Sequence, residues 1–176
     1  MKSHYSLLAC ILLLNGCSIL VGQVKPVEEK ATLNTPKKEL LQDPNWKKLQ
    51  IKSGTKSNED IPDAAWQSLE TAAVISLNSV CRQSIDEDGD IKEVSRLLMS
   101  QWDNLKIENE QDRVVSGFRA FETTAHGVYL NQNRKFQTVV VKSPTCVYDL
   151  VFLSPPKTFD QEITVFRKFR DNLSLK

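Results

Sequence analysis

The stretch CVYDLVFL at residues 146–153 decides the fold that this sequence predicts. Every position in it is apolar or aromatic except Asp149, so a strand formed here has two faces suited to burial. A strand that is covered on both faces belongs at the centre of a sheet. Pro155 and Pro156 follow closely and have no backbone N–H to donate, so we expect the strand to end before them.

The segments that precede this strand predict its neighbours in the same sheet. They are rich in β-branched and aromatic residues, which favour strands. The connections between them are short and hold Ser, Gly, Asn and Pro, so they predict antiparallel hairpins. The predicted strands are residues 107–115, 118–130 and 135–142, and the connections are residues 116–117, 131–133 and 143–145.

Residues 46–51 and 63–80 also favour strands. Between these and the later strands, apolar residues recur at the spacing of one amphipathic helix. Asp90 stands at the expected start of that helix, three residues before Glu93, in the pattern of a capping box. The apolar positions are Ile91, Val94, Leu97, Leu98, Trp102 and Leu105.

A second helix is predicted over residues 159–172, after the proline pair. Asp160 and Glu162 lie near its positive end and Lys168 and Arg170 near its negative end, as the helix dipole favours. Its apolar side, which we expect in the core, carries Phe159, Ile163, Phe166, Phe169 and Leu173.

This order of elements predicts an α+β fold. We expect an antiparallel sheet of about six to seven strands, packed between or against two helices as in an α/β/α sandwich.

The N-terminus carries a short apolar segment, Leu7 to Leu14, after Lys2. It is too short to span a bilayer, which takes about 20 residues, and fits the apolar region of a secretory signal, about 7–15 residues long. The segment runs into Leu14-Asn15-Gly16-Cys17, which resembles the lipobox of bacterial lipoprotein precursors.

This resemblance implies that Cys17 is a lipidation site. Diacylglycerol is attached to its sulfur, the chain is cut between Gly16 and Cys17, and the new amine is acylated, for example with palmitate. Two or three acyl chains anchor a protein stably to a membrane. Ser18 stands where inner-membrane lipoproteins commonly carry aspartate, so the resemblance favours the outer membrane. The alternatives are an uncleaved signal anchor and an ordinary secreted protein.

We therefore expect three parts: a signal peptide at residues 1–16, a lipidated tether at 17–45, and one globular domain at 46–176. The tether holds three prolines and no sustained apolar period, which is typical of a linker. A flexible coil of about 28 residues has an r.m.s. reach of roughly 30 Å.

Two cysteines, Cys81 and Cys146, belong to the predicted domain. Cys81 ends one predicted strand and Cys146 begins another, in a compartment that permits disulfides. We predict that they are bonded to each other. The alternatives are a reactive thiol, although the chain has no CxxC motif, and two buried reduced cysteines.

His126 is the only histidine after the predicted signal, so a metal site of several imidazoles is excluded. A catalytic triad would depend on it alone. Asp149 is flanked by apolar residues, so its carboxylate must find donors or shift its pKa. We expect it to make a structural hydrogen bond to backbone amides or to an arginine.

The acidic run at residues 86–90 suggests a calcium loop. Aligning it on Gly89 places Ser84 and Ser95 where such a loop normally supplies carboxylates. We therefore interpret the run as an acidic loop before a helix, and expect no metal site and no cofactor.

Charge and composition narrow the class of partner. The chain has 23 basic and 22 acidic residues, without the basic surface that nucleic acid requires. The predicted partners are therefore the membrane, through the lipid on Cys17, and an envelope protein.

The stretches NSVC at residues 78–81 and CVYDLV at 146–151, with the Phe-rich last helix, resemble a group of uncharacterised bacterial envelope lipoproteins. The element order is similar to the PsbP/Mog-type α/β/α sandwich. Neither resemblance implies a catalytic residue, because a fold does not confer a function.

We therefore expect a non-enzymatic binding or scaffolding domain, held in the envelope and facing the periplasm. One alternative is a hydrolase that uses His126 or a carboxylate. The other is a carrier of a small apolar ligand, which needs an apolar cavity between sheet and helices.

Overall fold

The computed structural model describes residues 41, 43–50, 62–81 and 89–175. The predicted signal peptide, Gly16, Cys17 and residues 86–88 of the acidic run lie outside the described residues.

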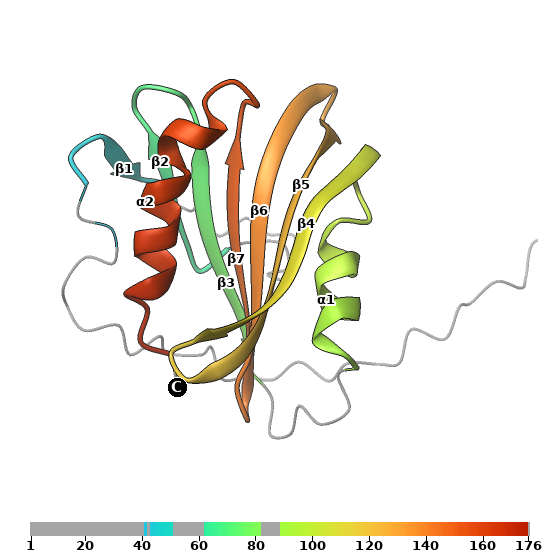
Figure 1. Cartoon of the computed structure of the whole chain (residues 1–176). Helices are drawn as coiled ribbons and strands as arrows, with labels where there is room; N and C mark the ends of the chain where they lie inside the picture. Colours follow the sequence, from blue (N-terminus) through green and yellow to red (C-terminus); the bar gives the residue numbers. More distant parts are fainter. Residues whose placement is uncertain (1–40, 42, 51–61, 82–88, 176) are drawn as a thin grey trace, which may run out of the picture.

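Seven antiparallel strands form one sheet in the order β1-β2-β3-β7-β6-β5-β4 (Figure 1). The predicted central strand, β7, does lie in the middle, between β3 and β6. The predicted α+β fold is confirmed. The strands are β1 Trp46–Lys48, β2 Ala64–Ser68, β3 Val74–Cys81, β4 Asp103–Val115, β5 Phe118–Tyr129, β6 Gln132–Lys142 and β7 Cys146–Ser154.

The two helices cover opposite faces of the sheet. Helix α1, Ile91–Leu98, packs through Ile91 on Val140 of β6, with Val147 of β7 beside them. Helix α2, Phe159–Asp171, packs on the face that carries Leu150 and Phe152 of β7. Alternate residues of a strand point to opposite faces of the sheet. Val147, which lies by α1, and Leu150, which lies under α2, therefore point to opposite faces, so the two helices lie on different sides. In Figure 1, α1 stands on the right beside β4, and α2 lies on the left in front of β2 and β3. The main strand contacts of α1 are with β5 and β6, and those of α2 are with β7.

The face under α2 holds most of the core. The phenylalanines of α2 pack against β7: the ring centroids of Phe152 and Phe159 are 5.2 Å apart, and those of Phe152 and Phe166 are 5.6 Å apart. Phe169 packs edge-on against Trp66 of β2, with centroids 5.2 Å apart. The predicted apolar side of the last helix is therefore confirmed as core.

The first helix is shorter than its apolar spacing predicts. It ends at Leu98, and the N–H of Met99 closes its last turn on the carbonyls of Arg96 and Leu97. The positions assigned to a further turn, Trp102 and Leu105, instead enter and join β4, where they pack with Met99 in one apolar cluster. Leu97 is 70% exposed rather than buried.

The predicted cap of this helix is confirmed, although the bond differs from a capping box. A side-chain oxygen of Asp90 accepts a hydrogen bond from the backbone N–H of Lys92, at 3.3 Å, and not from that of Glu93.

Two other predicted boundaries need correction. Strand β1 covers Trp46–Lys48 rather than residues 46–51, of which Ile51 lies outside the described residues. The β5–β6 turn is formed by Leu130 and Asn131, both with positive φ, rather than by residues 131–133. Residues 132 and 133 pair with β5 and lengthen the hairpin.

The strand register defines two ends of the sheet. At the end that we call the entry end, Trp46 begins β1 beside Ser68, and β7 ends at Ser154. At the opposite end, called the disulfide end, β3 finishes at Cys81 and β7 begins at Cys146.

Candidate functional site

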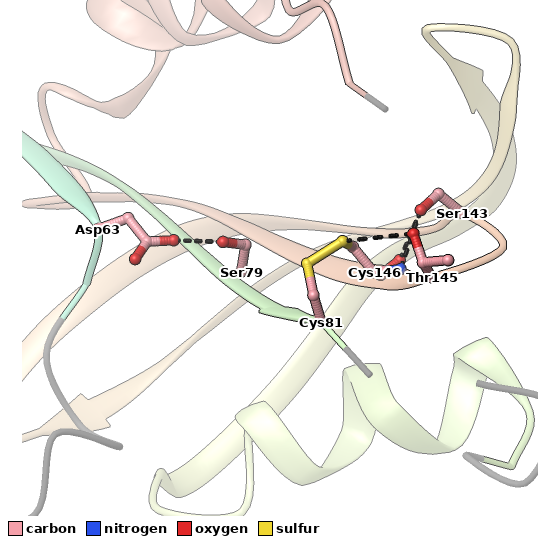
Figure 2. The surroundings of a disulfide bond; sticks show 6 residues. All are labelled: Asp63, Ser79, Cys81, Ser143, Thr145 and Cys146. Carbon is pink, nitrogen blue, oxygen red and sulfur yellow. Dashed lines mark hydrogen bonds between the residues drawn. A yellow bond between two sulfur atoms is a disulfide. The ribbon is translucent and has the colours of Figure 1, made fainter. Parts of the chain in front are cut away.

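The predicted disulfide is present and joins two neighbouring central strands. Cys81 of β3 and Cys146 of β7 lie directly opposite each other, with Cα atoms 4.1 Å apart (Figure 2). Cys146 is buried in the core cluster under α2, against which Cys81 also packs. As a disulfide the pair has no thiolate, so it cross-links strands rather than acting as a nucleophile.

The turn before Cys146 fixes its backbone. The backbone N–H of Ser143 donates to the carbonyl of Cys146 at 2.8 Å, and the Cys146 N–H donates to the Ser143 hydroxyl at 3.0 Å. Thr145 Oγ1 lies 3.7 Å from the Cys146 sulfur (Figure 2). These contacts hold the start of β7 in place for the bond with Cys81.

His126 lies in an exposed charged cluster toward the entry end. Its Nδ1 is 2.9 Å from an oxygen of Glu108, whose other oxygen is 2.7 Å from the Lys135 ammonium. The hydrogen bond from Lys135 contributes most to lowering the pKa of Glu108, and His126 lowers it further, against the opposing effect of burial. His126 and Glu108 are 42% and 36% exposed, so this pair lies on an open surface.

This cluster is the nearest approach to the hydrolase alternative. It joins the predicted His126 to a carboxylate, as that alternative requires. In the described part of the chain, however, its hydrogen bonds and ion pairs connect only His126, Glu108 and Lys135, and include no hydroxyl or thiol that could serve as a nucleophile.

A buried ionic network, absent from the predicted candidates, ties the end of α2 to the sheet. Glu122 of β5 is 1% exposed, and one of its oxygens accepts from Arg170 of α2. Its other oxygen accepts from Gln111 and lies 3.3 Å from an Arg113 nitrogen. Burial alone would lower the pKa of Arg170, but the carboxylates of Asp171 and Glu122 raise it by more. Both charges are compensated, so the network is a structural clamp.

A second buried carboxylate secures the first half of α2. The two oxygens of Glu162 accept hydrogen bonds from the hydroxyls of Ser68 and Thr71. Ser68 ends β2, so this contact fixes α2 to the entry end of the sheet.

Asp149 differs from both of these carboxylates. It lies on the face of β7 that points toward the α1 side, opposite Asn78 of β3 and Val140 of β6. Its Oδ1 is buried and has no hydrogen-bond partner among the described residues, so the predicted structural hydrogen bond is wrong for this atom. Burial raises the pKa of Asp149 from 3.8 to about 6. Thr138 Oγ1, on the adjoining strand β6, is likewise buried without a partner among these residues.

We expect Asp149→Asn to stabilise the domain at neutral pH. A raised folded-state pKa means that the unfolded chain loses its proton first, so stability falls as pH rises from about 4 to above 6. The shift to about 6 corresponds to up to about 3 kcal/mol, which the neutral amide recovers. Urea unfolding at pH 7.5 and pH 3.5 checks this expectation. Equal effects of the substitution at both values would contradict it.

Three further features were sought in the described residues: a metal site, a membrane-spanning helix and a cavity for an apolar ligand. Among the described residues, no group of three or more His, Cys, Asp or Glu side chains is placed to hold a metal ion. In this same part of the chain, no helix is both long and apolar enough to cross a membrane. The space between sheet and α2, where an apolar ligand would sit, is filled by side chains such as Ile75, Phe152 and Phe166, all fully buried.

Comparison with known proteins shows a likeness of fold. No protein-family model matches the chain, and no curated protein matches it in sequence. A solved structure of cyanobacterial PsbP from Synechocystis is 13% identical, with a TM-score of 0.53 over 73% of this chain and 80% of that chain. LpqN of Mycobacterium tuberculosis, described as involved in cell envelope biogenesis, is 10% identical, with a TM-score of 0.52 over 74% and 78%.

A third similar structure is PA94 of Pseudomonas aeruginosa, a protein of unknown function. It is 13% identical, with a TM-score of 0.49 over 78% of this chain and 88% of that chain. The PsbP structure shows that the resemblance predicted from the order of elements extends to the three-dimensional fold.

Proposed function

We propose that this chain is a lipid-anchored protein of the bacterial envelope whose domain binds or scaffolds another envelope component without catalysing a reaction. The Cys81–Cys146 disulfide is the observation that carries the proposal. Structural disulfides persist in oxidising compartments such as the periplasm and are rare in the cytosol. A chain exported to such a compartment needs a signal, and the residues that end at Cys17 supply one with a lipobox.

The similar fold of LpqN supports the envelope setting by analogy, since that protein is described as involved in cell envelope biogenesis. The absence of aspartate after Cys17 favours the outer membrane, with the domain on the periplasmic side.

The contacts made by the carboxylates favour binding over catalysis. Glu122 and Glu162 attach α2 to the sheet, and Glu108 bridges His126 and Lys135 on an open surface. A catalytic site instead holds reacting groups in a recess from which water is excluded.

We expect Cys17→Ala to abolish both lipidation and cleavage before residue 17. The thioether forms on the sulfur of this residue, so alanine has no site for diacylglycerol. Labelling cells with radioactive palmitate and separating soluble from membrane fractions measures the effect. Cys10→Ala is the matched control, because Cys10 lies inside the apolar segment and its loss should leave processing unchanged. Continued cleavage and labelling of the Cys17→Ala chain would refute the anchor.

The binding half of the proposal needs a separate experiment. Cross-linking the native lipoprotein in intact cells, then isolating it under denaturing conditions, identifies the component that it contacts. Repeating the capture with His126→Ala separates the two functions. The proposal expects the same cross-linked product from the variant, because binding does not need His126, whereas a covalent role of His126 predicts that the variant loses this product.

A further inference from the structure

The polypeptide joins the fold at the entry end of the sheet. Trp46 begins β1 there, and the carbonyl of Asn45 accepts a hydrogen bond from the backbone N–H of Leu69, at 2.8 Å. Leu69 follows the last residue of β2, in the turn that leads to β3. The segment that leads into β1 therefore passes directly beside Leu69.

Two exposed leucines lie at the tips of turns at this end. Leu69 is 65% exposed in the β2–β3 turn, and Leu130 is 77% exposed in the β5–β6 turn. The register places both turns beyond the same edge, since Gln67 pairs with Val74, and the β5–β6 hairpin continues past the pairing of Lys135 with Ser154. In Figure 1 both turns lie at the top of the sheet, on either side of the β7–α2 connection.

Leu130 has a backbone conformation that is unusual for a leucine. Its φ is +49°, in the left-handed region that suits Gly, Asn or Asp and disfavours a leucine side chain. Two-residue hairpin turns of this kind are normally built from Asn and Gly. An apolar side chain at this position is thus unfavourable for the turn and is also left in solvent, so neither folding nor solubility accounts for it.

We propose that the entry end faces the lipid bilayer and that Leu69 and Leu130 contact the membrane interface. This inference rests on the proposed anchor at Cys17. Apolar side chains on amphipathic helices are buried at the boundary between headgroups and acyl chains, about 5–10 Å deep, and we expect the two leucines to use the same boundary. Each contact alone is weak. An anchored domain makes it at the effective concentration that its tether sets, in the millimolar range for short flexible linkers.

The length of the intervening chain favours this end over the other. Leu41, four residues before Asn45, packs against the core and lies 24 positions after Cys17. As a coil, 24 residues have an r.m.s. reach of roughly 27 Å. The nine residues of β7 extend about 30 Å, so the disulfide end is a full sheet length farther from the point of entry. Most tether conformations therefore present the entry end to the membrane.

Depth-dependent quenching of tryptophan tests the orientation. The full-length lipidated protein is placed in vesicles of phosphatidylethanolamine and phosphatidylglycerol with brominated acyl chains. Separate variants carry Leu69→Trp, Leu130→Trp or, as the matched control, Val114→Trp. Val114 is 73% exposed but lies toward the disulfide end, opposite Arg119. After subtraction of the signal from the native tryptophans, we expect quenching at 69 and 130 to be at least about twofold stronger than at 114.

Two contrary outcomes are distinguishable. If the protein does not float with the vesicles, the anchor itself is refuted and this inference falls with it. If the protein floats but the three positions are quenched equally, the inference is refuted while the anchor stands. Hydrogen exchange of the unaltered lipoprotein provides a measurement free of substitutions. Moving it from detergent to vesicles should slow exchange at residues 69–73 and 129–132 and leave residues 115–118 unchanged.

Discussion

Arg170→Met is expected to lower the free energy of unfolding by about 3–5 kcal/mol, the usual effect of removing one partner of a buried ion pair. Arg170 and Glu122 are both buried, and Arg170 is the cation on one of the two Glu122 oxygens. Without the guanidinium, that oxygen loses a charged donor and has no water to replace it. The partly exposed Arg113 remains near the other oxygen, so we expect the lower part of this range. Urea unfolding at neutral pH measures the change.

Two controls distinguish the clamp from a general effect of losing an arginine. Arg119→Met removes exposed ion pairs with Asp112, at 3.5 Å, and with Asp90, at 4.0 Å, and should cost less than about 1 kcal/mol. The double variant Glu122→Met and Arg170→Met should cost clearly less than the sum of the two single changes, because the second change removes a charge that has already lost its buried partner. Strictly additive losses would mean that the two residues act independently, contrary to the structure.

The regular elements were predictable because each has a local signal. The apolar run at residues 146–153 identified β7 and its central position, and Ser116-Gly117 identified the β4–β5 turn. The spacing of the phenylalanines identified α2 within one residue of its end. In each case, side-chain periodicity and turn chemistry agree with the tertiary environment.

The errors in the prediction occur where two patterns overlap. Trp102 and Leu105 continue the helical spacing of α1, but they are partly buried just before and within β4, against the cluster around Met99. Sequence spacing alone does not distinguish these outcomes. Similarly, Leu130 has no turn propensity, and it takes a left-handed conformation because the flanking strands pair through Tyr129 and Gln132.

The charged contacts were harder to predict because they depend on register. Glu108 contacts His126 at a register shift of β4 between Ile107 and Asn109. No local sequence pattern predicts this irregularity. Arg170 carried a usable signal, since it follows Phe166 by four residues and so lies on the same side of α2. Its partner Glu122, 48 residues away, is identified only when β5 is placed beneath that helix.

Asp149 illustrates the difference between locating a residue and knowing its partners. The sequence correctly singled it out as a polar residue within the central strand. Whether its oxygens find donors depends on Asn78 and Val140, which the sheet places beside it, and on Thr138 diagonally across. Oδ1 has no hydrogen-bond partner among the described residues, and burial raises the pKa of the carboxyl group.

Reduction of the Cys81–Cys146 disulfide is expected to lower the free energy of unfolding by about 4 kcal/mol. The bonded residues are 65 positions apart, and in the chain-entropy model the bond removes the conformations of a loop of that size from the unfolded ensemble. The folded state changes little, because the β3–β7 ladder already holds Cys81 opposite Cys146. Stability should therefore fall mainly through the unfolded chain.

Urea unfolding of the mature protein with and without reductant measures this loss. The double variant Cys81→Ala and Cys146→Ala is the control: it should unfold near the midpoint of the reduced protein and should not respond to reductant. Thiol labelling of the denatured mature chain provides an independent check, since the lipid on Cys17 would leave only these two sulfurs. Equal labelling before and after reduction would show that the cysteines are free. The stability of the domain would then not depend on the oxidising compartment in which the anchor is proposed to hold it.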